Sequence, residues 1–138
     1  MDKVAVVILN WNGKAMLEKY LAPLVKHTPK FLSQNRGDSN NFVSIIIADN
    51  NSTDGSIEWL QDNYPSLQTI ILDKNYGFTG GYNRALKQVQ AEYFILLNSD
   101  ILVPDNWLQP LISFMDSNKK VGICQPKMLS LTRHLEIV

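Results

Sequence analysis

The chain has 138 residues, of which 45% are hydrophobic and 19% are charged, and 13 basic residues balance 13 acidic ones. We therefore expect one globular domain over residues 1–138, and the balanced charge argues against an electrostatic nucleic-acid binder. The single Cys124 and the lack of a signal-peptide pattern favour a cytoplasmic setting. The longest apolar runs are strand-sized, well short of the roughly 20 residues that cross a bilayer, and peripheral membrane contact stays an open alternative.

The N-terminal part of the chain alternates apolar strands with helices. Residues 4–9 form a short β-rich run, and turn-forming residues follow it. Apolar residues at helical spacing predict a helix over residues 14–26, which we expect Pro23 to kink or end. The polar segment 28–41 is interpreted as a long surface loop, and residues 42–48 as the second strand.

The alternation continues to the C-terminus. We expect, in order, a short helix ended by Tyr64-Pro65, a strand at 69–72, a loop at 73–78, a helix at 79–90, a strand at 93–97, a helix to about Met115 that Asp105 caps after Pro104, and a strand at 121–124. Alternating elements with short connections predict an α/β fold, with a mainly parallel sheet flanked by helices.

Polar side chains follow three of the predicted strands. Asn10, Asp49 and Asp100 each stand just beyond an apolar run, and the carboxyl ends of parallel strands converge on one edge of a sheet. Asp49 is suited to accept hydrogen bonds from a nucleobase imide or from ribose hydroxyls, or it caps the turn before Ser56. Asp54 is interpreted as a turn or helix-cap residue. The sequence thus predicts one pocket at this edge.

A glycine-rich segment opens the helix expected at residues 79–90. Gly77, Gly80 and Gly81 place backbone N–H groups where they can face an anion such as phosphate. Turn formation and close helix packing explain the same glycines without any ligand. Arg84 is suited equally to phosphate and to a surface carboxylate, so both interpretations of this segment stay open.

Asp100 is the candidate metal ligand. A hard cation such as Mg²⁺ or Mn²⁺ binds a few carboxylate oxygens together with substrate phosphates, and Asp100 with Asn98 supplies part of that set. The alternative is a turn or cap aspartate. We interpret Cys124 as a packed thiol in an apolar strand, and expect aromatic residues on helices to pack in the core, with Trp11 excepted because it lies in a pocket loop.

Other nucleotide-binding motifs are absent. The first strand is followed by Asn10-Trp11-Asn12-Gly13 rather than by the glycine fingerprint of dinucleotide-binding domains or by a P-loop. Neither His27 nor His134 has a partner at metal-ligand spacing or an obvious carboxylate neighbour in the sequence, so we do not expect either to be catalytic.

Four segments in this order and spacing carry a resemblance to a known family. They are Val6-Val7-Ile8-Leu9-Asn10-Trp11-Asn12-Gly13, Ala48-Asp49-Asn50-Asn51-Ser52-Thr53-Asp54-Gly55-Ser56, Asn75-Tyr76-Gly77-Phe78-Thr79-Gly80-Gly81-Tyr82-Asn83 and Leu96-Leu97-Asn98-Ser99-Asp100. Together they closely resemble the N-terminal half of the family-two inverting glycosyltransferases, particularly the branch of rhamnosyl- and galactofuranosyltransferases. The resemblance implies a Rossmann-like nucleotide-diphospho-sugar transferase fold.

The resemblance also implies how the donor, a UDP- or dTDP-sugar, is bound. Asn10 borders the nucleobase, Asp49 binds the base and ribose, the helix start lies beside the donor, and Asp100 is the metal-diphosphate ligand in the D-x-D position. The donor-binding set so implied is Asn10, Asn12, Asp49, Asn51, Gly80, Gly81, Asn83, Asn98, Ser99 and Asp100. Asn98 departs from the motif by replacing its first acidic residue, which predicts weaker binding of Mg²⁺ or Mn²⁺.

The family's mechanism is a single in-line displacement in which a general base deprotonates the acceptor hydroxyl. The resemblance places that base downstream of the donor domain, and residues 127–138 close with neither a helix nor a polar tail. We therefore expect a truncated domain, inactive alone, from an enzyme that acts on a saccharide or lipid-linked acceptor at the inner face of the membrane. The alternative is a non-catalytic nucleotide-binding or interaction module, and the sequence leaves oligomerisation open.

Overall fold

The computed structural model describes residues 1–32 and 41–131. These residues belong to two compact units, Met1–Asp105 and the segment that starts at Asn106. The predicted loop at 28–41 lies largely outside the described residues, as do His134 and the end of the chain. The first unit holds the sheet and every residue of the implied donor-binding set.

The sheet of the first unit is parallel and has the strand order β3-β2-β1-β4. Its strands are β1 (Asp2–Asn10), β2 (Val43–Asp49), β3 (Gln68–Ile71) and β4 (Ala91–Leu97). The central strand β1 is apolar and almost fully buried, because it has a strand on each side and helices over both faces. The predicted α/β fold with a parallel sheet is confirmed.

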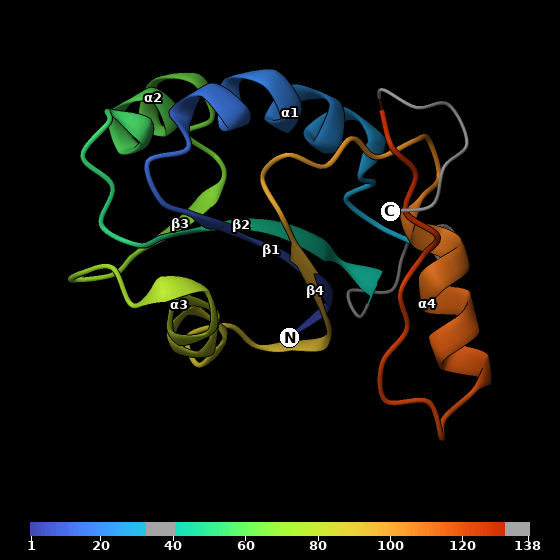
Figure 1. Ribbon diagram of the computed structural model, residues 1–138. Helices are drawn as coiled ribbons and strands as arrows, with labels where there is room; N and C mark the ends of the chain where they lie inside the picture. Colours follow the sequence, from blue (N-terminus) through green and yellow to red (C-terminus); the bar gives the residue numbers. More distant parts are fainter. Residues whose placement is uncertain (33–40, 132–138) are drawn as a thin grey trace. The chain divides into compact units, whose positions relative to one another are not determined.

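Helices cover the two faces of this sheet. Figure 1 shows α1 (Lys14–His27) and α2 (Ser56–Asn63) over one face and α3 (Gly77–Leu86) over the other. Successive side chains of a strand point to opposite faces of the sheet, so each face contributes to a hydrophobic core. Val7 and Ala48 belong to the core cluster under α3. On the other face, α1 buries Leu17, Leu21 and Leu24. Pro23 neither ends nor interrupts α1, contrary to one expectation.

The predicted strand bounds differ from the observed ones by one or two residues, and both predicted ends of the helix after β3 were wrong. The helix expected at 79–90 is α3, which begins at Gly77 and ends at Leu86, so Gly77 and Phe78 are helical rather than part of a loop. The helix starts early because a side chain from outside the segment holds its first residues. The side chain of Asn50 accepts from the Tyr76 backbone N–H and donates to the Gly77 carbonyl. Local turn signals could not reveal that support.

The second unit contains α4 (Leu108–Ser117). Its N-cap is Trp107 and no side chain caps it, so the prediction that Asp105 caps this helix was wrong. The strand expected at 121–124 does not form within the described residues, and Cys124 is half-buried rather than packed in a strand. An apolar run of this length has no strand character until a neighbouring strand pairs with it.

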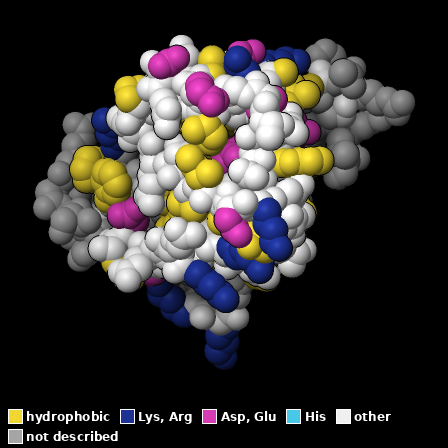
Figure 2. All heavy atoms as spheres, turned by 90° about the vertical axis from the view of Figure 1, so that its left-hand side faces the viewer, with side chains coloured by type: hydrophobic (Ala, Val, Ile, Leu, Met, Phe, Trp, Pro, Cys, Tyr) yellow, Lys and Arg dark blue, Asp and Glu magenta, His cyan; other side chains and the backbone are white. Residues whose placement is uncertain are grey.

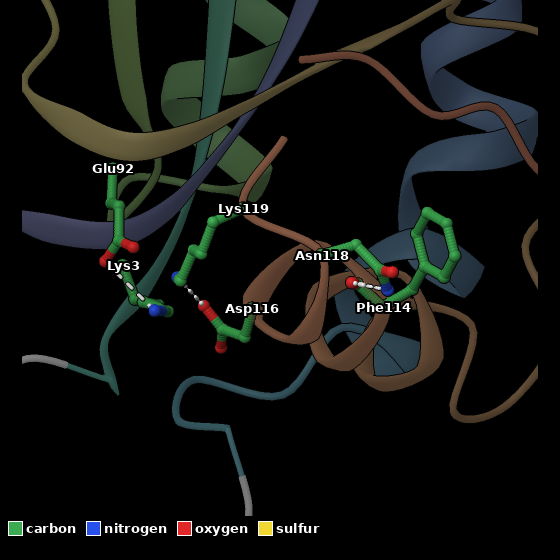
Figure 3. A network of polar contacts seen from close by, with 6 residues as sticks. All are labelled: Lys3, Glu92, Phe114, Asp116, Asn118 and Lys119. Carbon is green, nitrogen blue, oxygen red and sulfur yellow. Dashed lines mark hydrogen bonds and ion pairs between the residues drawn. The ribbon is translucent and has the colours of Figure 1, made fainter. Parts of the chain in front are cut away.

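Ion pairs and helix-end contacts support each unit separately. Figure 3 shows Lys3 of β1 paired with Glu92 of β4 at 3.0 Å. At the end of α4, Asp116 pairs with Lys119, and Asn118 donates to the carbonyl of Phe114 at 2.8 Å. These exposed contacts are of the kind that contributes at most about 1 kcal/mol each.

Candidate functional site

The carboxyl edge of the sheet brings the ends of β1 and β2 together. Asn10 and Asp49 are partners in the register of the two strands, and the backbone N–H of Asn50 donates to the Asn10 carbonyl at 2.8 Å. Both side chains are buried, at 1% and 0% exposure. The predicted convergence of these two strand ends is therefore observed.

The carboxylate of Asp49 accepts three hydrogen bonds inside the protein. Its Oδ2 accepts from Asn10 Nδ2 at 2.7 Å and from the Ser52 hydroxyl at 2.8 Å, and its Oδ1 accepts from the Ser52 backbone N–H at 2.7 Å. The bond to Ser52 N–H closes the turn after β2, which is the capping interpretation of Asp49. Direct contact between Asp49 and a nucleobase stays a prediction.

The loops after β1 and β2 are fastened to each other. The hydroxyl of Ser52 accepts from the backbone N–H of Asn12 at 2.8 Å, and the amide oxygen of Asn12 accepts from the Thr53 backbone N–H at 2.8 Å. Asn12 and Asn51 hold left-handed backbone angles, with φ of 50° and 63°, which asparagine tolerates better than most residues. Trp11, held by this loop, is 58% exposed.

Asp54 is structural, as the sequence indicated. Its carboxylate accepts from the Lys14 backbone N–H at 2.9 Å and from the backbone N–H and hydroxyl of Ser56, so it stabilises the first turns of both α1 and α2. Burial acts to raise the pKa of Asp54, but the hydrogen bonds from Ser56 and Lys14 outweigh it and hold that pKa below its ordinary value.

Asn50 connects the end of β2 to the start of α3. Its amide oxygen accepts from the Tyr76 backbone N–H at 3.2 Å, and its Nδ2 donates to the Gly77 carbonyl at 3.0 Å. A Cβ at Gly81 would lie 2.7 Å from that Nδ2 and 2.8 Å from a methyl carbon of Leu9. Gly81 therefore faces the interior, in keeping with the packing interpretation of this glycine.

The other residues at the start of α3 are more open. Asn83 and Gly77 are exposed, whereas Gly80 is half-buried, and a Cβ added to it would lie 3.0 Å from the side chain of Tyr76. The guanidinium of Arg84 stacks on the Tyr76 ring at 3.5 Å from the centroid. It also donates to the Gly80 carbonyl at 3.3 Å, and its charge is among the causes that lower the pKa of the Asp73 carboxyl. A contact between Arg84 and phosphate stays a prediction.

Tyr76 and Tyr82 orient the helix through their hydroxyl groups. The hydrogen bond from Tyr76 to the Asp73 carboxylate lowers the pKa of Asp73. Tyr82 is buried, donates to the Leu97 carbonyl at 3.1 Å and accepts from the Leu9 backbone N–H. Burial raises the pKa of Tyr82, and the bond from Leu9 opposes that shift. Tyr82 thereby joins α3 to the ends of β1 and β4.

The Asn98-Ser99-Asp100 segment forms a turn directly after β4, in which Asn98 and Asp100 are exposed and Ser99 is half-buried. It lies at the same edge as Asn10, because the Ser99 hydroxyl is 3.9 Å from the point where a Cβ on Gly13 would lie. Beside it is a shallow crevice with a mainly apolar wall, lined by Ile8, Leu17, Tyr20, Leu21, Leu24, Asn98, Ser99 and Ile101.

A divalent cation bound at this turn would need further oxygen ligands from a bound substrate, such as its phosphates. No group of three His, Cys, Asp or Glu side chains within the described ranges could hold a metal by itself. Mg²⁺ is commonly held by one or two carboxylates plus substrate phosphates, and the exposed carboxylate of Asp100 meets the protein's share of that requirement. The role of Asp100 as a metal ligand stays a prediction.

The fold gives His27 a carboxylate neighbour that is not evident in the sequence. Its Nδ1 lies 2.9 Å from the Val103 carbonyl, and its Nε2 lies 3.4 Å from Asp105 Oδ1. These contacts fasten the end of α1 to the segment after the Asp100 turn. Asp105 lies far from His27 in the sequence, so only the fold could reveal the pair.

The sequence alone assigns no role to Asn50. It predicts that Tyr82, as an aromatic residue on a helix, packs in the core, which is confirmed, but not that its hydroxyl joins α3 to the ends of β1 and β4. The signal for Asn50 was the Asp49-Asn50-Asn51 run at a strand end, whereas a helical tyrosine gives no sign of its hydroxyl partners. Figure 2 shows the face of the molecule on the side where β1 leads into α1, and hydrophobic, acidic and basic side chains are interspersed on it. Within the part of the chain described, no helix has the length and apolar character needed to cross a bilayer.

Two curated proteins illustrate what this chain is similar to. It is 27% identical over 125 residues to "Uncharacterized glycosyltransferase YfnE" of Bacillus subtilis, covering 88% of this chain and 29% of that protein. It is 28% identical over 88 residues to the N-acetylglucosaminyl-diphospho-decaprenol L-rhamnosyltransferase of Mycobacterium tuberculosis, covering 64% of this chain and 25% of that enzyme.

Two solved structures share the fold. S. aureus TarS 1-349 in complex with UDP-GlcNAc matches with a TM-score of 0.64 and 22% identity, over 85% of this chain and 32% of that one. The mannosyltransferase PcManGT of Pyrobaculum calidifontis, in complex with GDP-Man and Mn²⁺, matches with a TM-score of 0.55 and 20% identity, over 74% and 28%. The predicted fold is confirmed.

This chain spans less than a third of the length of each of these four proteins. The family model described as "Glycosyl transferase family 2" matches residues 5–130, which is most of the chain and includes the whole parallel sheet from Ala5 onward, the Asn10–Asp49 network and the Asp100 turn. The chain therefore belongs to Glycosyl transferase family 2.

Proposed function

We propose that this chain is the donor-binding domain of an inverting glycosyltransferase that uses a UDP- or dTDP-sugar. The observation that carries the proposal is the convergence of the Asn10–Asp49 network and the Asn98–Asp100 turn at the carboxyl edge of a parallel sheet, where α/β folds bind nucleotides. Membership of the family supports it, as do a TarS structure solved with UDP-GlcNAc and a PcManGT structure solved with GDP-Man.

The site offers distinct chemistry to the two ends of such a donor. The nucleoside end would meet the uncharged polar side chains of Asn12 and Asn51, in the loops after β1 and β2, together with the exposed indole of Trp11. The diphosphate end meets Asp100, which would hold Mg²⁺ or Mn²⁺. Such a metal, when bound, stabilises the charge of the departing nucleoside diphosphate.

Transfer requires a general base that deprotonates the acceptor hydroxyl. We assign this base and most of the acceptor site to a further part of the enzyme, and the coverage of less than a third of each relative supports that assignment. The domain alone is then inactive in transfer. The proposed acceptor is a cell-surface polysaccharide or a lipid-linked saccharide reached from the cytoplasm at the inner face of the membrane, as the relative named for a decaprenol-linked acceptor suggests.

The test is calorimetric titration of UDP and of dTDP into the protein, with and without Mn²⁺, alongside Asp100→Ala. We expect metal-dependent binding of one nucleotide that weakens at least tenfold in the variant. Asp62→Ala, which removes an exposed carboxylate from α2, serves as the matched control and should bind as the wild type does. A folded wild-type protein that binds neither nucleotide would refute the proposal.

A further inference from the structure

The amide oxygen of Asn10 is a buried acceptor that has no hydrogen-bond partner among the described residues. The orientation of this amide is fixed, because its Nδ2 lies 2.7 Å from the Asp49 carboxylate and 3.1 Å from the Ser52 hydroxyl. A flipped amide would place its oxygen against the carboxylate instead. Since buried polar atoms are nearly always paired, a donor that reaches Oδ1 is expected.

The hydroxyl of Ser99 is a side-chain donor that borders the same space as Asn10 Oδ1. The position of a Cβ added to Gly13 would lie 2.5 Å from Asn10 Oδ1 and 3.9 Å from Ser99 Oγ. Both oxygens therefore border one small space, which stays free only because residue 13 is glycine. Asn10 ends β1, whereas Ser99 sits in the turn that also carries Asp100.

We propose that Ser99 is a positioning residue whose hydroxyl donates to Asn10 Oδ1 when the Asn98–Asp100 turn closes on a bound nucleoside diphosphate. This inference rests on the proposed function. The new bond ties the Asp100 turn to the Asn10–Asp49 network, so the diphosphate end and the nucleoside end of the site are assembled together. Asn10 Oδ1 has no partner among the described residues, so the turn must move toward Asn10 to make this bond.

This arrangement separates the effect of Ser99 on binding from its effect on stability. A neutral hydrogen bond made only in the complex changes affinity by roughly three- to tenfold. Its loss leaves the unfolding of the unliganded protein unchanged. A serine that merely supports the turn would lower stability as well, so the two roles are distinguishable.

The experiment titrates UDP and dTDP, each with Mg²⁺, into the wild type, Ser99→Ala and Ser99→Thr, and measures urea unfolding without nucleotide. We expect Ser99→Ala to bind three- to tenfold more weakly with an unchanged unfolding midpoint, and Ser99→Thr, which keeps the hydroxyl, to bind like the wild type. Ser66→Ala, at an exposed serine in the turn before β3, is the matched control.

A second readout follows Asn10 directly. Nuclear magnetic resonance of the Asn10 side-chain amide should show a shift on addition of nucleotide and Mg²⁺ in the wild type and in Ser99→Thr, but not in Ser99→Ala. Three outcomes would each overturn this inference and leave the proposed function intact. They are binding by Ser99→Ala equal to that of the wild type, a lowered unfolding midpoint in that variant, and the same Asn10 shift in all three proteins. A folded wild type that binds neither nucleotide overturns the proposed function and this inference with it.

Discussion

Replacing Asp49 with asparagine tests whether its carboxylate organises the site. The carboxylate accepts three hydrogen bonds, two at Oδ2 and one at Oδ1, and is fully buried. An amide has the same shape but only one acceptor atom. Whichever way the introduced amide turns, its NH₂ group meets a donor, either the amide of Asn10 or the backbone N–H of Ser52.

The expected effect follows from these three bonds. A hydrogen bond to a charged group contributes about 1.5–3 kcal/mol, and a buried donor left without a partner costs about 1–3 kcal/mol. Removing a buried charge offsets part of this loss. We expect Asp49→Asn to lower the free energy of unfolding by about 2–4 kcal/mol, which is a large share of the roughly 5–15 kcal/mol typical of a folded domain.

The assay is urea unfolding followed by circular dichroism, with nucleotide titration of the folded variant in parallel. Asp62→Asn, on the exposed surface of α2, is the control and should stay within about 0.5 kcal/mol of the wild type. A loss below about 1 kcal/mol for Asp49→Asn would refute the argument that this network holds the strand ends together. Unchanged stability with abolished binding would instead assign Asp49 to the ligand.

Three further outcomes are expected. Gly81→Ala should destabilise the protein by about 1–3 kcal/mol in urea unfolding, because the added Cβ would lie 2.7 Å from the Asn50 side chain. Gly122→Ala, whose Cβ would have no atom within 4 Å, is the control and should be nearly neutral. Equal effects of the two substitutions would contradict this reasoning. The lowered pKa of Asp54 means that its ionised form stabilises the fold above the ordinary value of 3.8 and that this contribution disappears as pH falls through the folded pKa. Asp54→Asn should therefore show a smaller loss of stability in that acid range, and parallel pH profiles for both proteins would be against it. Asn98→Asp should strengthen Mn²⁺-dependent nucleotide binding by supplying a second carboxylate, and calorimetry showing no change would rule out Asn98 as a determinant of metal affinity.

The sequence by itself determined the order of elements from β1 to α4 and the edge where the site lies. Apolar runs such as 4–9 and 93–97 are strand-sized and need cover on both faces, which only a parallel sheet with helices on each side provides. Polar residues placed directly after such runs must then meet at the carboxyl edge. For the same reason Asn10 and Asp49 could be paired before the fold was known, and four short motifs sufficed to suggest the family.

The tertiary structure decided which side chains are free and which are engaged. Asp49 and Asp54 are both acidic residues in one polar cluster, but only their distant partners, Asn10 for the first and Lys14 for the second, define what each carboxylate does. The start of α3 depends on Asn50, and the missing strand at 121–124 depends on a pairing neighbour. Hydrogen bonds and strand pairing join residues far apart in the chain, whereas sequence patterns register only residues that are near one another.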